Sequence, residues 1–289
     1  MTVYSSYKQL IGQLESLYDL REATNIADWV LEYLTKQTRT WRIINKNIEL
    51  TALEIGLLAS ITEKLLQNIP VQYVLNESWF AGMKFFVNKS VLIPRPETEE
   101  LVDWIIHDQN NRYTELNESR ILDIGSGSGC IPITLKYKIP NSKIVSIDVS
   151  EEALEVAQRN AYTLDVAIDF QQFDFLDVDS WDSLGKFDLI VSNPPYIKQI
   201  EQLEMHSRVT DFEPSLALFV PDEDPLLFYR KIVLFARQHL VENGTIYVEI
   251  NELLGKETCI LFETYGFSTE LKQDLQGKDR MIKAHLLSK

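Results

Sequence analysis

Cysteine and histidine are scarce in this sequence. Its 289 residues include two cysteines, Cys130 and Cys259, which lie far apart and lack the spacing of metal ligands. This excludes a disulfide framework and a zinc ribbon and favours a reducing compartment, where we expect both thiols to be buried. The four histidines show no spacing typical of a metal site or a catalytic triad. We therefore predict no metal centre.

Long hydrophobic runs are also lacking. No stretch approaches the roughly 18 uncharged apolar residues that a membrane span needs. The first residues, Met1 to Lys8, contain no basic segment followed by an apolar one, so they do not resemble a signal peptide. We expect a cytoplasmic protein without a membrane partner.

Basic residues are outnumbered by acidic ones. The chain has 28 Lys and Arg against 43 Asp and Glu, with a net charge of -15 and a pI near 4.8. Such a chain repels phosphate backbones and anionic lipid, so direct DNA binding is not expected. Glycine (11) and proline (10) are few, and 45% of the residues are hydrophobic, which excludes collagen and wholesale disorder. The length suits two ordinary domains.

The first part of the chain has a helical pattern. From residue 4 to about 70, apolar residues recur at spacings of three and four. Two capping boxes are predicted, one formed by Ser6 with Gln9 and the other by Thr51 with Glu54. In each of them, a hydroxyl and the side chain three residues later satisfy two backbone N–H groups at a helix start.

Pro70 is expected to end the helical segment. Residues 79–93 are rich in aromatic and branched side chains with Gly and Asn breaks, which predicts a β-hairpin. The expected organisation is therefore a helical domain over residues 1–76, a hairpin linker over 77–96 and a larger domain over 97–289.

Short branched runs alternate with helical patterns in the larger domain. The predicted strands are 120–124, 143–149, 168–173, 187–192 and 245–250, and the predicted helices are 131–137, 151–164 and 226–240. This alternation indicates βαβ units, and hence an α/β fold with a parallel sheet. Two last strand-like runs, near 267–275 and 281–287, flank a turn at Gly277. They predict an antiparallel hairpin at the sheet edge.

A glycine-rich loop gives the cofactor signal. The run Gly-Ser-Gly-Ser-Gly from Gly125 to Gly129 follows the first strand of the larger domain and opens a helix, where backbone approaches a ligand closely. The dinucleotide fingerprint needs a glycine at position 130, which is Cys130, and a P-loop needs a Gly-Lys-Ser/Thr sequence that is absent. With Asp123 in front, the loop resembles the first motif of class I S-adenosylmethionine (SAM) methyltransferases. The alternative interpretation is an ordinary strand-to-helix turn.

Three residues at the ends of neighbouring strands extend this prediction. Asp148 ends the second strand, where an acidic residue accepts hydrogen bonds from ribose hydroxyls. Asp174 and Phe175 follow the third strand, where such folds contact adenine. For these two residues the alternative is the edge of the core followed by a turn.

The sequence Asn193-Pro194-Pro195-Tyr196 follows the strand at 187–192. A planar NH2 group is a poor nucleophile because its lone pair is delocalised, so an enzyme that methylates one must hold both N–H bonds. The Asn193 side-chain oxygen and the Pro194 carbonyl can each accept one of them, and the Tyr196 ring can pack on the flat face. The prolines stiffen the loop, which orients the acceptors in advance. The alternative is a Pro-Pro strand terminator with a capping asparagine.

This loop alone leaves the substrate open, because amide, adenine and guanine amines present the same planar donor pair. With further segments, however, the sequence resembles the protein N5-glutamine methyltransferases of the HemK/PrmC type over nearly its whole length. The segments that carry the resemblance are the helical part, the hairpin, 92–99 (Leu-Ile-Pro-Arg-Pro-Glu-Thr-Glu), 123–129, Asp148, 193–196, 213–218 and 273–280. The segment Pro-Arg-Pro-Glu-Thr distinguishes this family from two others. Nucleic-acid amine methyltransferases generally lack it, and the similar enzymes that act on a ribosomal protein differ just after Pro-Arg.

The resemblance implies a fold, a reaction and a partner. The fold is that of class I SAM methyltransferases, a Rossmann-like mixed sheet, with a small N-terminal helical domain that docks substrate. The reaction is methylation of the glutamine in the Gly-Gly-Gln motif of class I peptide-chain release factors, with SAM as the cofactor. The predicted cofactor-binding residues are Gly125, Ser126, Gly127, Ser128, Gly129, Asp148, Asp174, Phe175 and Asn193. The predicted substrate-binding residues are Arg95, Asn193, Pro194, Pro195 and Tyr196, of which Asn193, Pro194 and Tyr196 are the catalytic ones.

Two segments depart from the family pattern. Asn251-Glu252 stands where a glycine with a following glutamine is common, and the glycine expected after the Glu-Pro segment is replaced near Asp224-Pro225. Both are expected to be peripheral to the methyl-transfer site. The carboxylates of the segment around Glu97 also have another interpretation, because acidic residues are favourable in the first turn of a helix that starts at Pro96.

Three other functions stay open. One is an N6-adenine or guanine-amine methyltransferase of nucleic acid, which needs a basic groove, yet from Tyr196 to Arg208 two basic residues are matched by two acidic ones. A salt-sensitive gel shift would detect it. The second is methylation of a ribosomal-protein glutamine. The third is a SAM-binding scaffold without turnover, against which the intact loop from Asn193 argues.

Overall fold

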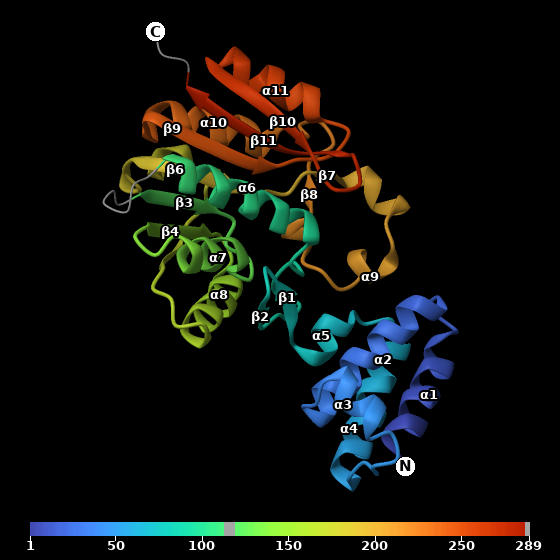
Figure 1. Cartoon of the computed structure of the whole chain (residues 1–289). Helices are drawn as coiled ribbons and strands as arrows, with labels where there is room; N and C mark the ends of the chain where they lie inside the picture. Colours follow the sequence, from blue (N-terminus) through green and yellow to red (C-terminus); the bar gives the residue numbers. More distant parts are fainter. Residues whose placement is uncertain (113–118, 287–289) are drawn as a thin grey trace. The chain divides into compact units, whose positions relative to one another are not determined.

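A computed structural model describes residues 1–112 and 119–286 of the protein. The chain forms two compact units, Met1–Glu77 and Ser78–Lys289 (Figure 1). The first unit is helical, and the second is built around a seven-stranded sheet.

Amphipathic helices build the first unit, as their apolar spacing predicted. They are α1 (Val3–Leu14), α2 (Leu20–Thr35), α3 (Arg39–Ile44), α4 (Ala52–Leu66) and α5 (Val71–Leu75). Their apolar faces meet in one core, which includes the fully buried Leu14, Leu31 and Leu65. Each such side chain contributes about 1.5–3 kcal/mol to stability by leaving water.

One of the two predicted capping boxes is present. Thr51 Oγ1 accepts a hydrogen bond from the Glu54 N–H at 3.2 Å, and Glu54 Oε2 accepts one from the Thr51 N–H at 2.7 Å. The box at Ser6 is wrong, because Thr2 caps α1 and accepts from the Ser5 N–H at 3.1 Å. The helix starts at the buried Val3, one turn earlier than predicted, so Ser6 lies inside it.

Pro70 does not end the helical segment. It is the N-cap residue of the short helix α5. A proline has no N–H to leave unsatisfied at a helix start, so it is tolerated there. A further short helix therefore follows Pro70 and runs to Leu75, after α4 has ended at Leu66.

The predicted hairpin is present but short. Strand β1 (Ser78–Phe80) pairs antiparallel with β2 (Met83–Phe85) through a two-residue turn, in which Ala81 (φ 49°) and Gly82 (φ 76°) both have positive φ. Residues 86–93 form no strand. The pairing stops at Phe86, where Asn160 takes both backbone groups, accepting from the N–H at 2.7 Å and donating to the carbonyl at 2.9 Å.

The second unit contains the predicted mixed sheet, in the order β10-β11-β9-β6-β3-β4-β5. Its strands are β3 (Arg120–Ile124), β4 (Lys143–Asp148), β5 (Asp169–Gln172), β6 (Phe187–Ser192), β9 (Leu240–Glu249), β10 (Phe267–Gln273) and β11 (Asp279–Leu286). Five strands are parallel, from β5 to β9, while β11 and β10 form the predicted antiparallel hairpin at one edge. Strand β9 begins at Leu240, before the predicted 245–250. The prediction started too late because Asn243 (φ 63°) and Gly244 look like a turn in the sequence.

Helices cover both faces of this sheet (Figure 1). They are α6 (Pro96–Arg112), α7 (Cys130–Lys138), α8 (Glu151–Thr163), α10 (Leu227–His239) and α11 (Gly255–Thr264). Shorter elements are α9 (Ser207–Thr210), the parallel pair β7 (Ile197–Lys198) and β8 (Phe219–Val220), and 3-10 turns at Val178–Ser183, Gln199–Glu204 and Ser215–Ala217.

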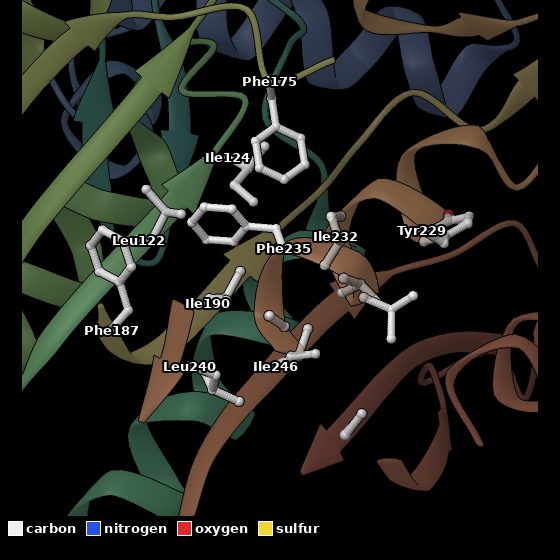
Figure 2. Close-up of a cluster of buried hydrophobic side chains, with 14 of the residues drawn as sticks. Leu122, Ile124, Phe175, Phe187, Ile190, Tyr229, Ile232, Phe235, Leu240 and Ile246 are labelled. Carbon is white, nitrogen blue, oxygen red and sulfur yellow. The ribbon is translucent and has the colours of Figure 1, made fainter. Parts of the chain in front are cut away.

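Alternate residues of the strands point to opposite faces and divide the core in two. Leu122 and Ile190 belong to the cluster beneath α10 and α11, which Figure 2 shows. Ile121 belongs to the cluster beneath α6 and α7. Cys130 is buried as predicted, but the prediction for Cys259 is wrong. Cys259, on α11, is only half-buried at the edge of the first cluster.

Candidate functional site

The glycine loop connects β3 to α7 in a conformation that requires glycine. Gly125, Gly127 and Gly129 have φ of 87°, 51° and 79°. A Cβ atom at Gly125 or Gly127 would meet nothing within 4 Å, whereas one at Gly129 would lie 2.9 Å from Ile133 Cδ1 and 3.1 Å from Ala157 Cβ. The first two glycines thus leave open space, and Gly129 allows α7 to pack against α8.

Hydrogen bonds attach this loop to the end of β4. The Gly125 and Ser126 N–H groups donate to the Ile147 carbonyl at 2.9 and 3.0 Å. Asp148 accepts from the Gly127 N–H at 2.9 Å and from the Ser150 N–H at 3.0 Å. Burial raises the pKa of the Asp148 carboxyl group, while these N–H groups lower it. A carboxylate has about four acceptor positions, so Asp148 can still accept from a ligand diol.

A buried polar chain supports the same loop from below. Asp123 Oδ2 accepts from the Ser146 hydroxyl at 2.7 Å, and the Ser146 and Ser126 hydroxyls lie 2.5 Å apart. Within the described residues, Asp123 Oδ1 has no hydrogen-bond partner. Burial raises the pKa of Asp123 to about 7.

Asn193 follows β6, at the same edge of the sheet as the glycine loop. Its Nδ2 donates to Thr98 Oγ1 at 3.0 Å. Because the amide nitrogen is engaged there, the side-chain oxygen remains available to accept a hydrogen bond. Pro194 is buried beside it and fixes the backbone.

Tyr196 is anchored by its hydroxyl group. The hydroxyl donates to Glu249 Oε1 at 3.1 Å, and the ring packs against the hydrophobic cluster of Figure 2. Burial and the nearby Glu249 charge raise the pKa of Tyr196, which keeps the hydroxyl protonated as a donor. Tyr196 does not belong to the lining of the cavity described next.

A cavity of about 320 Å³ brings most of the predicted site residues together. It lies at the carboxyl ends of the parallel strands, where β4 and β6 flank β3, which is the usual place of a ligand in such sheets. The predicted residues that line it are Arg95, Gly125, Ser126, Gly127, Ser128, Asp148, Asp174, Phe175, Asn193, Pro194 and Pro195. Gly129 and Tyr196 are the two predicted residues outside this lining.

Phe175 and Asp174 differ in their surroundings. Phe175 is buried, with its ring stacked on Trp181 at 5.5 Å between centroids and edge-on to Phe235. Asp174 is exposed and accepts from the Leu176 N–H at 2.9 Å. Phe175 therefore belongs to the core as well as to the cavity wall, and its contact with adenine stays a prediction.

Arg95 joins two segments of the cavity lining. Its guanidinium lies 2.6 Å from Glu213 Oε1, and the Ile93 N–H donates to Glu213 Oε2 at 3.2 Å. Glu213 is buried and precedes Pro214, which lines the cavity. The Pro-Arg-Pro and Glu-Pro-Ser segments thus meet in space.

Sequence reasoning missed Glu249. This carboxylate, 1% exposed at the end of β9, accepts from Thr98 Oγ1 at 2.6 Å and from the Tyr196 hydroxyl at 3.1 Å. Burial raises its pKa, whereas the hydrogen bonds from Thr98 and Tyr196 and the charge of Arg280 lower it. The available signal was a carboxylate at the end of a buried strand, since parallel strands bring their carboxyl ends to one edge.

Asn251 does not line the cavity, but it is connected to a loop that does. Its Nδ2 donates to the Tyr196 carbonyl at 3.4 Å, so it contacts the Asn-Pro-Pro-Tyr loop. The neighbouring Glu252 pairs with Lys278 at 2.8 Å and Arg280 at 3.2 Å. Asp224 instead pairs with Arg230 at the start of α10, at 2.7 Å. Asp224 is not among the residues that line the cavity.

The donor set of the cavity fits SAM. Gly125 and Gly127 leave room where a Cβ would stand, Asp148 offers acceptors for ribose hydroxyls, and apolar side chains such as Phe173 offer a surface for adenine. Across the part of the chain that the structure describes, no three His, Cys, Asp or Glu side chains gather to hold a metal ion. Within residues 1–112 and 119–286, none of the helices has the length and apolar character to cross a bilayer.

Comparison with known proteins shows which families this chain resembles. The family described as "Methyltransferase small domain" matches residues 109–210, and the one described as "PrmC N-terminal domain" matches residues 7–75. A release factor glutamine methyltransferase of Flavobacterium psychrophilum is 43% identical over 99% of both chains. One of Bacteroides thetaiotaomicron is 41% identical over 84% of this chain and 85% of its own. The catalytic domain of hMettl16, solved with a 3'UTR hairpin, has a TM-score of 0.56 at 14% identity, over 89% of this chain and 92% of that one, and supports the fold alone.

Proposed function

We propose that this chain, which belongs to the release factor glutamine methyltransferase family, transfers a methyl group from SAM to the side-chain amide nitrogen of the glutamine in the Gly-Gly-Gln motif of release factors. The observation that carries the proposal is the hydrogen bond from Asn193 Nδ2 to Thr98. Among the described residues the Asn193 oxygen then has no hydrogen-bond partner, so it can accept from a ligand in the cavity that Gly125, Gly127 and Asp148 also line.

We assign the cofactor to the part of the cavity formed by the glycine loop. Gly125 to Ser128 would contact it through backbone, and Asp148 would accept hydrogen bonds from the ribose. Asp174 and Phe175 would border the adenine. When bound, SAM supplies an electrophilic methyl group on sulfur.

Asn193 and Pro194 would hold the substrate amide. The Asn193 oxygen and the Pro194 carbonyl each accept one N–H bond of the glutamine side chain, which fixes the plane of the amide and draws electron density onto its nitrogen. No base is needed before the attack, because the proton becomes acidic only as the new C–N bond forms. As that bond forms, the bond between the methyl group and the sulfur of SAM would break, the sulfur would leave as a neutral thioether, and the amide proton would pass to solvent. Placement of this kind supplies on the order of 7–11 kcal/mol of barrier reduction. The prolines hold the acceptors in place beforehand.

The remaining predicted substrate contacts belong to the same proposal. Pro195 lines the cavity, and Arg95 lines it while paired with Glu213. Tyr196 acts through the position of the loop, since its hydroxyl is bound to Glu249. We assign substrate docking to the helical unit Met1–Glu77, which the PrmC N-terminal domain matches over residues 7–75.

A labelled-methyl assay tests the function. The purified protein is incubated with methyl-labelled SAM and a release factor, beside a release factor whose Gly-Gly-Gln glutamine is replaced by alanine. Label is expected in the first protein and not in the second. Arms with adenine-containing DNA, RNA and ribosomal protein test the alternatives. Label confined to one of those arms would refute release factor as the substrate.

A further inference from the structure

We infer that Glu249 is a positioning residue. It acts through the Thr98 hydroxyl, which holds the Asn193 side chain with its oxygen, and not its NH2 group, directed at the substrate. The inference rests on the proposed function, because it concerns the acceptor that would hold the substrate amide. Glu249 does not line the cavity, but Thr98 and Asn193 do. The three side chains come from β9, α6 and the loop after β6.

The direction of each hydrogen bond follows from counting protons. A threonine hydroxyl has one proton and accepts through its lone pairs. The Tyr196 hydroxyl and the Arg280 charge favour the ionised form of Glu249, and an ionised carboxylate can only accept. Thr98 Oγ1 lies 2.6 Å from Glu249 Oε2, so its proton is committed to Glu249. Toward Asn193, Thr98 can then only accept, and it does so from Nδ2 at 3.0 Å.

This arrangement excludes the inverted amide. The two ends of an asparagine amide have nearly the same size, so packing alone does not distinguish them. If the Thr98 hydroxyl were not committed to Glu249, it could donate to the Asn193 oxygen and leave the NH2 group for the substrate. An NH2 group cannot accept the N–H of a glutamine side chain, and the productive contact would be lost.

Both oxygens of the carboxylate serve the same loop. Oε2 acts on Asn193 through Thr98, and Oε1 accepts from Tyr196, so Glu249 holds residues on both sides of Pro194 and Pro195. The backbone of Glu249 is fixed as well, since its carbonyl accepts from the buried Tyr229 hydroxyl at 3.1 Å. A buried carboxylate is costly compared with an apolar side chain, which is consistent with a role in orientation.

Kinetics of Thr98 variants test the inference. Thr98→Val removes the hydroxyl at nearly constant volume, and Thr98→Ser keeps it. For transfer to release factor we expect kcat to fall about tenfold or more in Thr98→Val, a change of about 1.4 kcal/mol, with Kd for SAM changed less than about twofold. Thr98→Ser should stay within about twofold of wild type. Wild-type kcat in Thr98→Val, or an equal loss in Thr98→Ser, would overturn the inference.

Thr258→Val is the matched control. Thr258 is also fully buried and its hydroxyl donates to the Leu254 carbonyl at 2.7 Å, but it lies on α11 and does not line the cavity. This variant should lose stability without losing kcat. Glu249→Leu is a second test, because it removes the acceptor that holds the Thr98 proton and frees the hydroxyl to donate to Asn193. It should lower kcat as Thr98→Val does, and an unchanged kcat would contradict the inference.

Neutron diffraction of the perdeuterated wild-type protein needs no activity. The Thr98 deuteron is expected on the side of Glu249, and both amide deuterons on the Asn193 atom that faces Thr98. A Thr98 deuteron directed at Asn193 would overturn the inference. Absence of label on release factor with wild-type protein would instead refute the proposed function, so the two failures can be told apart.

Discussion

The Arg95 guanidinium lies 2.6 Å from the Glu213 carboxylate, and this ion pair joins two segments that are far apart in the sequence. The Glu213 side chain is 2% exposed and that of Arg95 32%. Burial removes the Glu213 carboxylate from water, and the charge of Arg95 and the N–H of Ile93 compensate for this lost hydration. Both partner segments line the cavity, so the pair links stability to ligand binding.

Removing the arginine should destabilise the protein. In Arg95→Leu the buried Glu213 is left without its cation, and we expect the free energy of unfolding to fall by about 2 kcal/mol, less than for a fully buried pair because Arg95 is partly exposed. Urea unfolding measures this. Arg230→Leu is the control, since its pair with Asp224 has side chains 41% and 34% exposed. It should cost below about 1 kcal/mol. Equal losses in the two variants would contradict the prediction.

Loss of the Asn193 acceptor should impair turnover and spare cofactor binding. Asn193→Ala removes the side-chain oxygen that we assign to the substrate amide. By analogy with the loss of a preorganised polar group, we expect kcat to fall about a hundredfold or more. Labelled-methyl kinetics and SAM titration measure the two effects separately. Unchanged turnover would refute the role of Asn193.

Two glycines of the same loop should respond differently to alanine. Both positions have positive φ, which costs an alanine about 1–2 kcal/mol. In Gly129→Ala the new Cβ also meets Ile133 and Ala157, so we expect a loss of about 3 kcal/mol in unfolding free energy. In Gly127→Ala the Cβ meets no protein atom within 4 Å and enters the space that we assign to SAM.

Gly127→Ala should therefore weaken SAM binding more than it destabilises the fold. Isothermal titration gives Kd, and urea unfolding gives the stability of each variant. If Gly127→Ala bound SAM as wild type does, the assignment of the cofactor to this loop would be wrong.

Asp123 should make stability depend on pH. Burial raises its pKa from an ordinary value near 3.8 to about 7, so the folded state holds the proton more tightly than the unfolded state does. This stabilisation is complete below about pH 3.8 and is lost as the pH rises through about 7. Between pH 5 and 8 the contribution falls by about 3 kcal/mol.

The variant Asp123→Asn should lack this decline, because it has no proton to release. Unfolding free energies at a series of pH values, measured without SAM, give the two slopes. The exposed Asp179→Asn is the control and should keep the wild-type decline. Parallel curves for wild type and Asp123→Asn would show that Asp123 does not titrate in this range.

Local patterns predicted most of the elements. The spacing of apolar residues gave the helices of the first unit, and the alternation of branched runs with helical patterns gave the sheet. The failures lie where a tertiary contact replaces a local rule. The pairing of the hairpin stops at Phe86, where Asn160 takes both backbone groups, and Ser6 lies inside α1 because Thr2 caps the helix one turn earlier.

The sequence by itself determined the family, since its motifs are contiguous and each carries its own chemistry: the glycine loop, Pro-Arg-Pro-Glu-Thr and Asn-Pro-Pro-Tyr. Only the tertiary structure decided how these motifs act on one another. Thr98, Asn193 and Glu249 are distant in the chain, and parallel strands together with the start of α6 bring them within hydrogen-bond distance. Hydrogen bonds act over about 3 Å, so which groups form them depends on the fold and not on their spacing along the chain.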